Sequence, residues 1–202
     1  KYDLNSLKVV MYGGSPLSEE GYEFIYKGVN KNVMISSMPG GTEIASCFAL
    51  ANPLSNVRAS EAQGWGLGMK CDVFDDNGNS LKEKKGELVC TASFPSQPLY
   101  FLGDTNKKKY RESYFNVYPN VWRHGDYAMV SKDGGVVVSG RSDATLNPGG
   151  IRIGTAEIYN VLEEVEEITD SMAVGQKWND DERIILFVKL KQNLKLTEEL
   201  IR

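Results

Sequence analysis

The sequence predicts an α/β segment, then a small antiparallel β-barrel subdomain, and then the beginning of a small α+β domain. Three observations favour this fold class. Strand, helix and strand patterns alternate at the start of the chain, short strands with hairpin signals fill its middle, and an amphipathic helix with two strands follows Gly140. We expect the divisions 1–62, 63–141 and 142–202.

The first part of the chain has the pattern of a βαβ unit. An apolar run at 7–12 is typical of a buried strand and leads into a glycine turn. Ser18 can cap the following helix, because its hydroxyl can accept from free backbone N–H groups. The predicted buried face of this helix follows i, i+3, i+4 and i+7 spacing: Tyr22, Ile25, Tyr26 and Val29. A second apolar run at 33–35 completes the unit.

Two hairpin signals mark the middle of the chain. The sequence DDNG separates strand candidates at 71–74 and 86–90, and KDGG separates candidates at 127–130 and 136–138. Both turns contain glycine, which readily adopts the left-handed conformations that tight hairpins need. These short strands predict an antiparallel sheet or barrel.

The last part of the chain begins with a loop-rich stretch after Gly140. We expect a helix over 155–167 with one apolar face: Ile158, Val161, Leu162, Val165 and Ile168. Strand candidates follow at 172–174 and 184–190. This order predicts an α+β domain, with its boundary near 141–144.

Composition argues against several functional classes. The net charge of −4 disfavours a nucleic-acid surface, and the basic run at 107–109 is expected in a solvated loop. No apolar run approaches the roughly 20 residues that span a bilayer. Cys47, Cys71 and Cys90 are widely spaced and lack a CxxC pair, which indicates reduced thiols in a cytoplasmic protein.

Both ends of the sequence suggest an internal piece of a longer chain. It begins at Lys1 without a methionine. Near the other end Thr197 precedes acidic residues, which is typical of a helix start. The sequence then stops at Arg202, after about one helical turn, which is not stable alone.

Several catalytic motifs find no match. The run GWGLG at 64–68 is followed by Met69 where GxGxxG needs its third glycine, and no phosphate-loop pattern GxxxxGK[ST] occurs. The segment 75–79 is out of register for a calcium-binding loop. The single histidine, His124, gives little support to a zinc site or a Ser-His-Asp triad.

Four segments remain as candidate binding sites, and two of them follow predicted strands. The turn at 13–16 lies where open α/β sheets bind ligands, although a plain turn also explains it. In the segment 40–43, glycines would let the backbone approach phosphate, Thr42 could donate to it and Glu43 could hold Mg²⁺.

The other two segments lie further along the chain. Asp126 follows a glycine and could accept hydrogen bonds from both ribose hydroxyls, but a surface aspartate in a turn is the alternative. The stretch 140–153 gathers Arg141, Arg152 and a glycine pair. Arginine's planar fork suits phosphate oxygens, and a solvated linker is the alternative.

The chain resembles the adenylate-forming superfamily of acyl-CoA synthetases, adenylation domains and luciferases in the order of five motifs: GGSPLS, PGGTE, GEL, HGDYA and GRSDATLNPGGIRIGTAEIYN. The resemblance covers residues 7–190. The last motif, together with the first two, most resembles the branch of the superfamily that activates acetoacetate. The resemblance implies the large-domain and small-domain fold of that superfamily, truncated at both ends.

The resemblance also implies roles for residues around the nucleotide. Gly14, Ser15 and Pro16 would line the adenine side of the site. Thr42 would contact the α-phosphate of ATP, and Glu43 would bind Mg²⁺.

Further roles are implied nearer the domain boundary. Asp126 would bind the ribose hydroxyls, Arg141 would support that contact, and Arg152 would reach toward the phosphate. Asp143 matches the hinge about which the small domain rotates between two half-reactions. The loop that lines the CoA tunnel would contain Gly149 and Gly150.

The implied activity is that of an ATP-dependent acid–thiol ligase. It would convert acetoacetate or a similar short acid, with ATP, Mg²⁺ and CoA, to acyl-CoA, AMP and pyrophosphate through an acyl-adenylate. No segment matches the family's phosphate loop or its catalytic lysine, so we expect the chain alone to be inactive. Another acyl-CoA ligase, an adenylation domain and a non-catalytic nucleotide-binding fragment are the alternatives. The sequence leaves the oligomeric state and the exact acid open.

Overall fold

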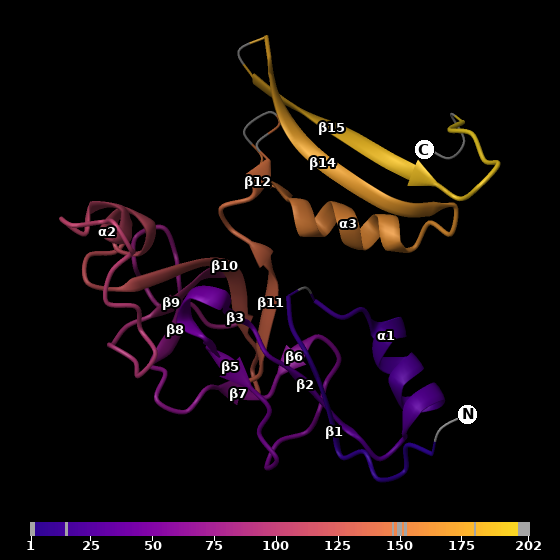
Figure 1. Cartoon of the computed structure of the whole chain (residues 1–202), viewed down its shortest axis with the longest axis horizontal. Helices are drawn as coiled ribbons and strands as arrows, with labels where there is room; N and C mark the ends of the chain where they lie inside the picture. Colours follow the sequence, from indigo (N-terminus) through magenta and orange to yellow (C-terminus); the bar gives the residue numbers. More distant parts are fainter. Residues whose placement is uncertain are drawn as a thin grey trace. The chain divides into compact units, whose positions relative to one another are not determined.

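A computed structural model describes residues 3–14, 16–146, 148, 151, 153–179 and 181–197, without the side chains of 181 and 182 (Figure 1). The chain divides into two compact units, Lys1–Val138 and Ser139–Arg202. Each unit has its own secondary structure, so each is considered by itself. In the described residues, no helix is long and apolar enough to cross a membrane.

The first unit begins with the predicted βαβ arrangement. Strand β1 (Val9–Tyr12) pairs in parallel with β2 (Met34–Ser37), and the two are joined by α1 (Glu19–Phe24) and a π-helix (Ile25–Val29). The Ser18 side chain accepts a hydrogen bond from the Gly21 N–H, which confirms the predicted cap. Apolar residues from all of these elements bury Tyr22 in a small core.

A five-stranded sheet forms the larger part of the first unit, in the order β6-β11-β10-β9-β8. Its strands are β6 (Glu61–Ala62), β8 (Cys71–Phe74), β9 (Gly86–Cys90), β10 (Trp122–Val130) and β11 (Val136–Arg141). Both predicted hairpin turns are confirmed. The Gly78 N–H bonds to the carbonyl of Asp75, and the Gly134 N–H bonds to the carbonyl of Ser131.

Smaller elements lie between these strands. Strand β3 (Gly40–Gly41) pairs with β4 (Ser46–Cys47), and β5 (Ala49–Leu50) pairs with β7 (Gly64–Trp65). Residues Thr42–Ile44 form a 3₁₀ helix, and Lys108–Tyr114 form α2. The expected loop at the basic run is therefore wrong, because Lys108 begins a helix and can pair with Glu112 one turn later.

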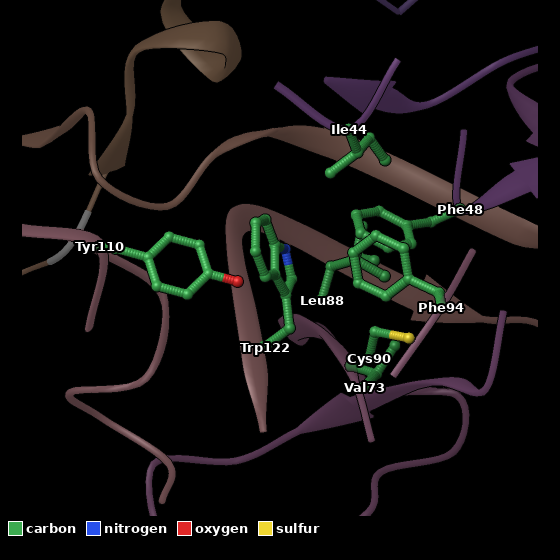
Figure 2. Packing of buried hydrophobic residues seen from close by; sticks show 9 residues of the cluster. Ile44, Phe48, Val73, Leu88, Cys90, Phe94, Tyr110 and Trp122 are labelled. Carbon is green, nitrogen blue, oxygen red and sulfur yellow. The ribbon is translucent and has the colours of Figure 1, made fainter. Parts of the chain in front are cut away.

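An aromatic core joins the sheet to its surrounding loops. Figure 2 shows Trp122 between Tyr110 on one side and Leu88, Phe48 and Phe94 on the other. The Trp122 ring stacks on Tyr114 at 3.7 Å between ring centroids, and Phe94 packs edge-on against it at 5.4 Å. This core contains Ile44, which directly follows the candidate residue Glu43, and Trp122, which lies four positions before the candidate residue Asp126.

The second unit contains β12 (Thr145–Leu146), β13 (Ile153–Gly154), α3 (Thr155–Glu163), β14 (Ile168–Trp178) and β15 (Asp181–Leu190). Strands β14 and β15 form a long antiparallel pair. Each is longer than the strand that the sequence predicted at 172–174 or 184–190. The backbone N–H of Ala173 donates to the Tyr159 hydroxyl, which ties α3 to this pair.

Helix α3 differs from its predicted extent. It ends at Glu163 and not at 167, since acidic residues follow and its last turn holds no basic residue. Negative charge at a helix C-terminus is unfavourable because the helix dipole is negative there. The predicted apolar face is also wrong at one position, because Val161 is 65% exposed.

The three cysteines all lie in strands and are free thiols, as predicted: Cys47 in β4, Cys71 in β8 and Cys90 in β9. Cys71 and Cys90 stand directly opposite each other in the β8–β9 pair.

Candidate functional site

The carboxyl ends of β1 and β2 bring two glycine loops together. The backbone N–H of Met38 donates to the Tyr12 carbonyl at 2.9 Å, just beyond the paired residues Tyr12 and Ser37. A Cβ atom on Gly13 would lie only 3.3 Å from the Met38 carbonyl oxygen. Gly14 has a φ of +90°, which favours glycine. Gly13 and the 38–43 loop are therefore neighbours at one edge of this sheet.

Both glycines of the PGGTE motif lie so close to neighbouring atoms that a side chain would not fit at either position. A Cβ on Gly40 would lie 2.6 Å from the Cα of Cys47, and one on Gly41 would lie 2.8 Å from Cε1 of His124. Immediately after them, the 3₁₀ helix buries Ile44 completely in the aromatic core. Packing on both sides therefore sets the position of Thr42 and Glu43, which are exposed.

A β-bulge shapes the HGD motif. Arg123 and Tyr127 of β10 pair with Val89 and Glu87 of β9, so three residues on β10 face the single residue Leu88. Bulges of this kind redirect side chains and are common beside active sites. Gly125, in the middle of the bulge, has a φ of +84°.

The buried carboxylate of Glu87 holds this bulge from the neighbouring strand. Its Oε1 accepts a hydrogen bond from the Gly125 N–H at 3.0 Å and lies 3.2 Å from Nε of Arg123. Hydrogen bonds to a charged acceptor are roughly twice as strong as neutral ones. Glu87 therefore fixes the backbone from which His124 and Asp126 project.

The bulge places His124 between two carboxylates. Its Nδ1 lies 3.8 Å from Oε1 of Glu43, and its Nε2 lies 3.5 Å from Oδ2 of Asp126. The side chains of His124 and Asp126 are only 1% and 11% exposed, whereas the Glu43 side chain is 32% exposed. Neither ring nitrogen has a hydrogen-bond partner in the described part of the chain. We call these three residues the acidic–imidazole cluster.

The aromatic core determines how the imidazole is oriented. Phe48 packs edge-on against the His124 ring, with 4.7 Å between centroids and 76° between planes. The alternative that Asp126 is an ordinary surface aspartate is not supported by its burial. Because the cluster borders the 38–43 loop, it also adjoins the edge where β1 and β2 end.

Glu43 is the residue of the cluster predicted to bind a metal ion. In the described ranges, no group of three or more histidine, cysteine, aspartate or glutamate side chains is arranged for a metal. Mg²⁺ is commonly bound by one or two carboxylates together with substrate phosphates and water. The partly exposed Glu43 fits that mode of binding.

Two other predicted residues, Arg141 at the end of β11 and Asp143 after it, lie in the second unit, which begins within that strand at Ser139. Nε of Arg141 donates to Oδ1 of Asp143 at 2.8 Å, and its terminal nitrogen donates to the second carboxylate oxygen. Both side chains are about half exposed, at 48% and 51%. Before them, Gly140 has a φ of +117° and leaves no room for a Cβ, which would lie 2.6 Å from the Cβ of Ala156.

The described structure covers only part of the predicted site. It includes Gly14, the exposed Pro16, Thr42, Glu43, Asp126, Arg141 and Asp143. The predicted positions Ser15, Gly149, Gly150 and Arg152 lie outside the described residues.

Sequence reasoning missed two residues that shape the site. Glu87 contributed to the resemblance through the GEL motif, but nothing near it in the sequence indicated a partner 38 residues away. His124 was considered only for zinc binding and a catalytic triad. Its position directly before Gly-Asp is the one signal that could have linked it to the candidate carboxylate Asp126.

Known proteins match this chain over its whole length. It is 51% identical over 201 residues to an acetoacetyl-coenzyme A synthetase of Rhizobium meliloti. It is 43% identical over 203 residues to the acetoacetyl-CoA synthetase of Gallus gallus. The chain spans 31% and 30% of the length of these two relatives. No protein-family model matches it.

Solved structures confirm the fold. The acetoacetyl-CoA synthetase from Streptomyces lividans matches 96% of this chain with a TM-score of 0.83 and 39% identity, over 30% of its own length. The anthranilate CoA ligase AuaEII, solved with anthranoyl-AMP, matches 99% of this chain with a TM-score of 0.74 and 22% identity. The second likeness covers 37% of that protein and bears on the fold alone. These matches confirm the resemblance to adenylate-forming enzymes and the predicted fold class.

Proposed function

The chain corresponds along its whole length to one segment of acetoacetyl-CoA synthetases, and from this premise we propose that it is part of an ATP-dependent acid–CoA ligase. The observation that carries the proposal is the acidic–imidazole cluster. It brings the candidate ribose-binding Asp126 and the candidate metal-binding Glu43 to the two sides of one buried side chain.

The proposed reaction has two steps. In the first, a carboxylate oxygen of the acid attacks the α-phosphorus of ATP, and the bond to the bridging oxygen breaks to release pyrophosphate. In the second, the thiol sulfur of CoA attacks the acyl carbon, and the bond to AMP breaks. Both steps need nucleotide and acid held in fixed orientation, which can supply a large share of the catalysis.

Residues of the first unit would hold the nucleotide. Asp126 would accept hydrogen bonds from the ribose hydroxyls, and its burial would make these bonds strong because water is excluded. Thr42 is exposed beside Glu43 and would donate to the α-phosphate. Gly14, Ser15 and Pro16 would border the adenine, and Gly13, directly before them, lies next to the same loop.

Glu43 would bind Mg²⁺ together with the phosphates, and the cation would offset negative charge as the two anions meet. Its partial exposure, on a 3₁₀ helix anchored by Ile44, supports this role. Arg152 would approach the phosphate, and Arg141 would support the ribose contact. We assign CoA to the loop that contains Gly149 and Gly150, and the hinge to Asp143.

Acetoacetate is the proposed acid, since the most similar relatives described above are named for it. The three unpaired cysteines favour a reducing compartment, so we place the protein in the cytoplasm. Its small-molecule partners would be the acid, ATP and CoA.

The experiment is an exchange assay with the ligase that contains this chain. Labelled pyrophosphate should enter ATP when acetoacetate is present, and much less when acetate or a long-chain acid replaces it. Equal kcat/KM for these acids would favour another acyl-CoA ligase or an adenylation domain. Nucleotide binding without acid-dependent exchange would favour the non-catalytic alternative and contradict the proposal.

A further inference from the structure

His124 occupies a position that the proposed chemistry does not yet use. It is the single histidine of the chain, it is 3% exposed, and both of its ring nitrogens lack hydrogen-bond partners in the described residues. Buried polar groups without partners are costly, and they are rare. An unpartnered imidazole therefore calls for a physical explanation.

We propose that His124 is a positioning residue that couples Glu43 to Asp126. Its Nδ1 faces Glu43 and its Nε2 faces Asp126, so one ring joins the carboxylate assigned to the metal with the carboxylate assigned to the ribose. The inference rests on the proposed function for the roles of the two carboxylates. The coupling between them is a separate claim, and it follows from the geometry.

The distances suit a contact that closes when ligands bind. Separations of 3.8 Å and 3.5 Å exceed the length of a good hydrogen bond. A shift of about 1 Å in either carboxylate would bring it within hydrogen-bonding distance of the ring. Hydrogen bonds in active sites are often long until the ligand is present. Glu43 is the more mobile candidate, because its side chain is partly exposed.

The ring itself has little freedom to move. Phe48 lies edge-on against it, and Gly41 approaches so closely that even one methyl group there would contact Cε1. Glu87 fixes the backbone directly after it through the Gly125 N–H. Because the imidazole is held and the Glu43 side chain can adjust, His124 acts as the fixed reference between the two carboxylates.

A neutral imidazole donates from one nitrogen and accepts at the other. It can therefore donate to only one of the two carboxylates at a time, and the position of its proton reports which one. Engagement of one carboxylate by a ligand would then change the imidazole's bond to the other. This is the coupling that we infer between the nucleotide and metal sides of the cluster.

The test is nitrogen NMR of the ligase that contains this chain, labelled with ¹⁵N-histidine, in which the His124 resonances are identified by their loss in His124→Phe. Glu43→Gln should move the proton toward Nε2 and Asp126→Asn should move it toward Nδ1, so that in each variant the two nitrogen resonances shift in opposite directions. Adding adenosine to the wild-type protein should then move both nitrogen resonances, although adenosine carries the ribose without the phosphate that Thr42 and Glu43 would approach. Resonances that stay at their wild-type positions in both variants would overturn the inference.

A second measurement separates coupling from a merely structural role. His124→Phe should weaken AMP binding roughly tenfold, the loss expected for one hydrogen bond to a charged group. Tyr110→Phe is the control, because Tyr110 is buried in the same core but its hydroxyl donates to the Pro98 carbonyl. It should leave AMP affinity unchanged. An equal loss of affinity in both variants would mean that His124 only fills space, and would overturn the inference.

The two proposals can fail separately. If AMP does not bind but the imidazole still responds to Glu43→Gln and Asp126→Asn, the nucleotide role fails and the coupling stands. If AMP binds with the imidazole resonances unchanged in both variants, the nucleotide role stands and the coupling fails.

Discussion

The acidic–imidazole cluster and the Arg141–Asp143 pair hold their charged groups in different ways. His124 and Asp126 are buried, and their backbone is fixed by a bulge, by Glu87 and by the aromatic core. Arg141 and Asp143 are about half exposed and bond to each other across two positions of the chain. One arrangement depends on residues far apart in the sequence, whereas the other is local.

This difference predicts different responses to mutation. Groups fixed by a packed core cannot move without disturbing it, because protein interiors are close-packed. An exposed ion pair can break and re-form at little cost, since such pairs contribute about 0–1 kcal/mol. The cluster therefore suits fixed binding of a nucleotide, and the local pair suits a segment that changes conformation.

Truncating the core beneath the cluster should have the largest effect. Trp122→Ala should destabilise the first unit by about 3–5 kcal/mol, the usual cost of removing a buried aromatic ring. Denaturant unfolding followed by circular dichroism measures this. Val161→Ala, at an exposed position of α3, is the matched control and should change stability by less than about 0.5 kcal/mol. Similar losses in both variants would mean that the core does not support the cluster.

Removing the buried carboxylate of Asp126 should weaken the binding of ATP. Asp126→Ala should raise the KM for ATP about tenfold to a hundredfold, because a lost hydrogen bond to a charged group costs about 1.5–3 kcal/mol. Steady-state kinetics of the ligase that contains this chain would show the change. An unaltered KM for ATP would remove Asp126 from the ribose site.

Filling the space beside the cluster should have an intermediate effect. Gly41→Ala would push on Glu43 and His124, and overpacking of this kind costs about 1–3 kcal/mol. Gly64→Ala is the control, because a Cβ there meets nothing within 4 Å. Thermal unfolding should separate the two variants, with only Gly41→Ala showing a lower Tm. Equal Tm values would indicate that the loop adjusts and that its glycines are not needed for fit.

The smallest effect on stability is expected at the local pair. Arg141→Ala should change the free energy of unfolding by less than about 1 kcal/mol, since the pair is solvent-exposed. Denaturant unfolding of the 202-residue chain would measure this. A loss of several kcal/mol would show that Arg141 stabilises more than its own segment.

Local signals predicted much of the fold. Ser18, the DDNG and KDGG turns and the apolar runs each depend on neighbouring residues, and the structure contains all of these features. The end of α3 was misjudged because apolar spacing outweighed the acidic residues after Glu163. The full length of β14 and β15 was missed because exposed polar residues in them lie opposite each other, as Gln176 and Arg183 do.

Only part of the candidate site could be predicted from the sequence. Motif order indicated Thr42, Glu43 and Asp126, because each lies in a short segment of recognisable composition. The bulge at 124–126 depends on the hydrogen bond from Gly125 to Glu87, which no local pattern encodes. The role of His124 likewise depends on a carboxylate 81 positions earlier in the chain, Glu43, which only the fold brings within 3.8 Å.

The most direct test of the contrast between fixed cluster and movable segment compares Asp126→Ala with Asp143→Pro in the two half-reactions. Proline fixes φ near about −65° and should trap one conformation at the proposed hinge. Pyrophosphate exchange measures adenylate formation, and CoA added to preformed acyl-adenylate measures thioester formation. We predict that Asp126→Ala impairs ATP use in the first assay, and that Asp143→Pro impairs only one assay while the fold stays intact. Equal loss of both activities in a folded Asp143→Pro variant, or full retention of both, would contradict this account.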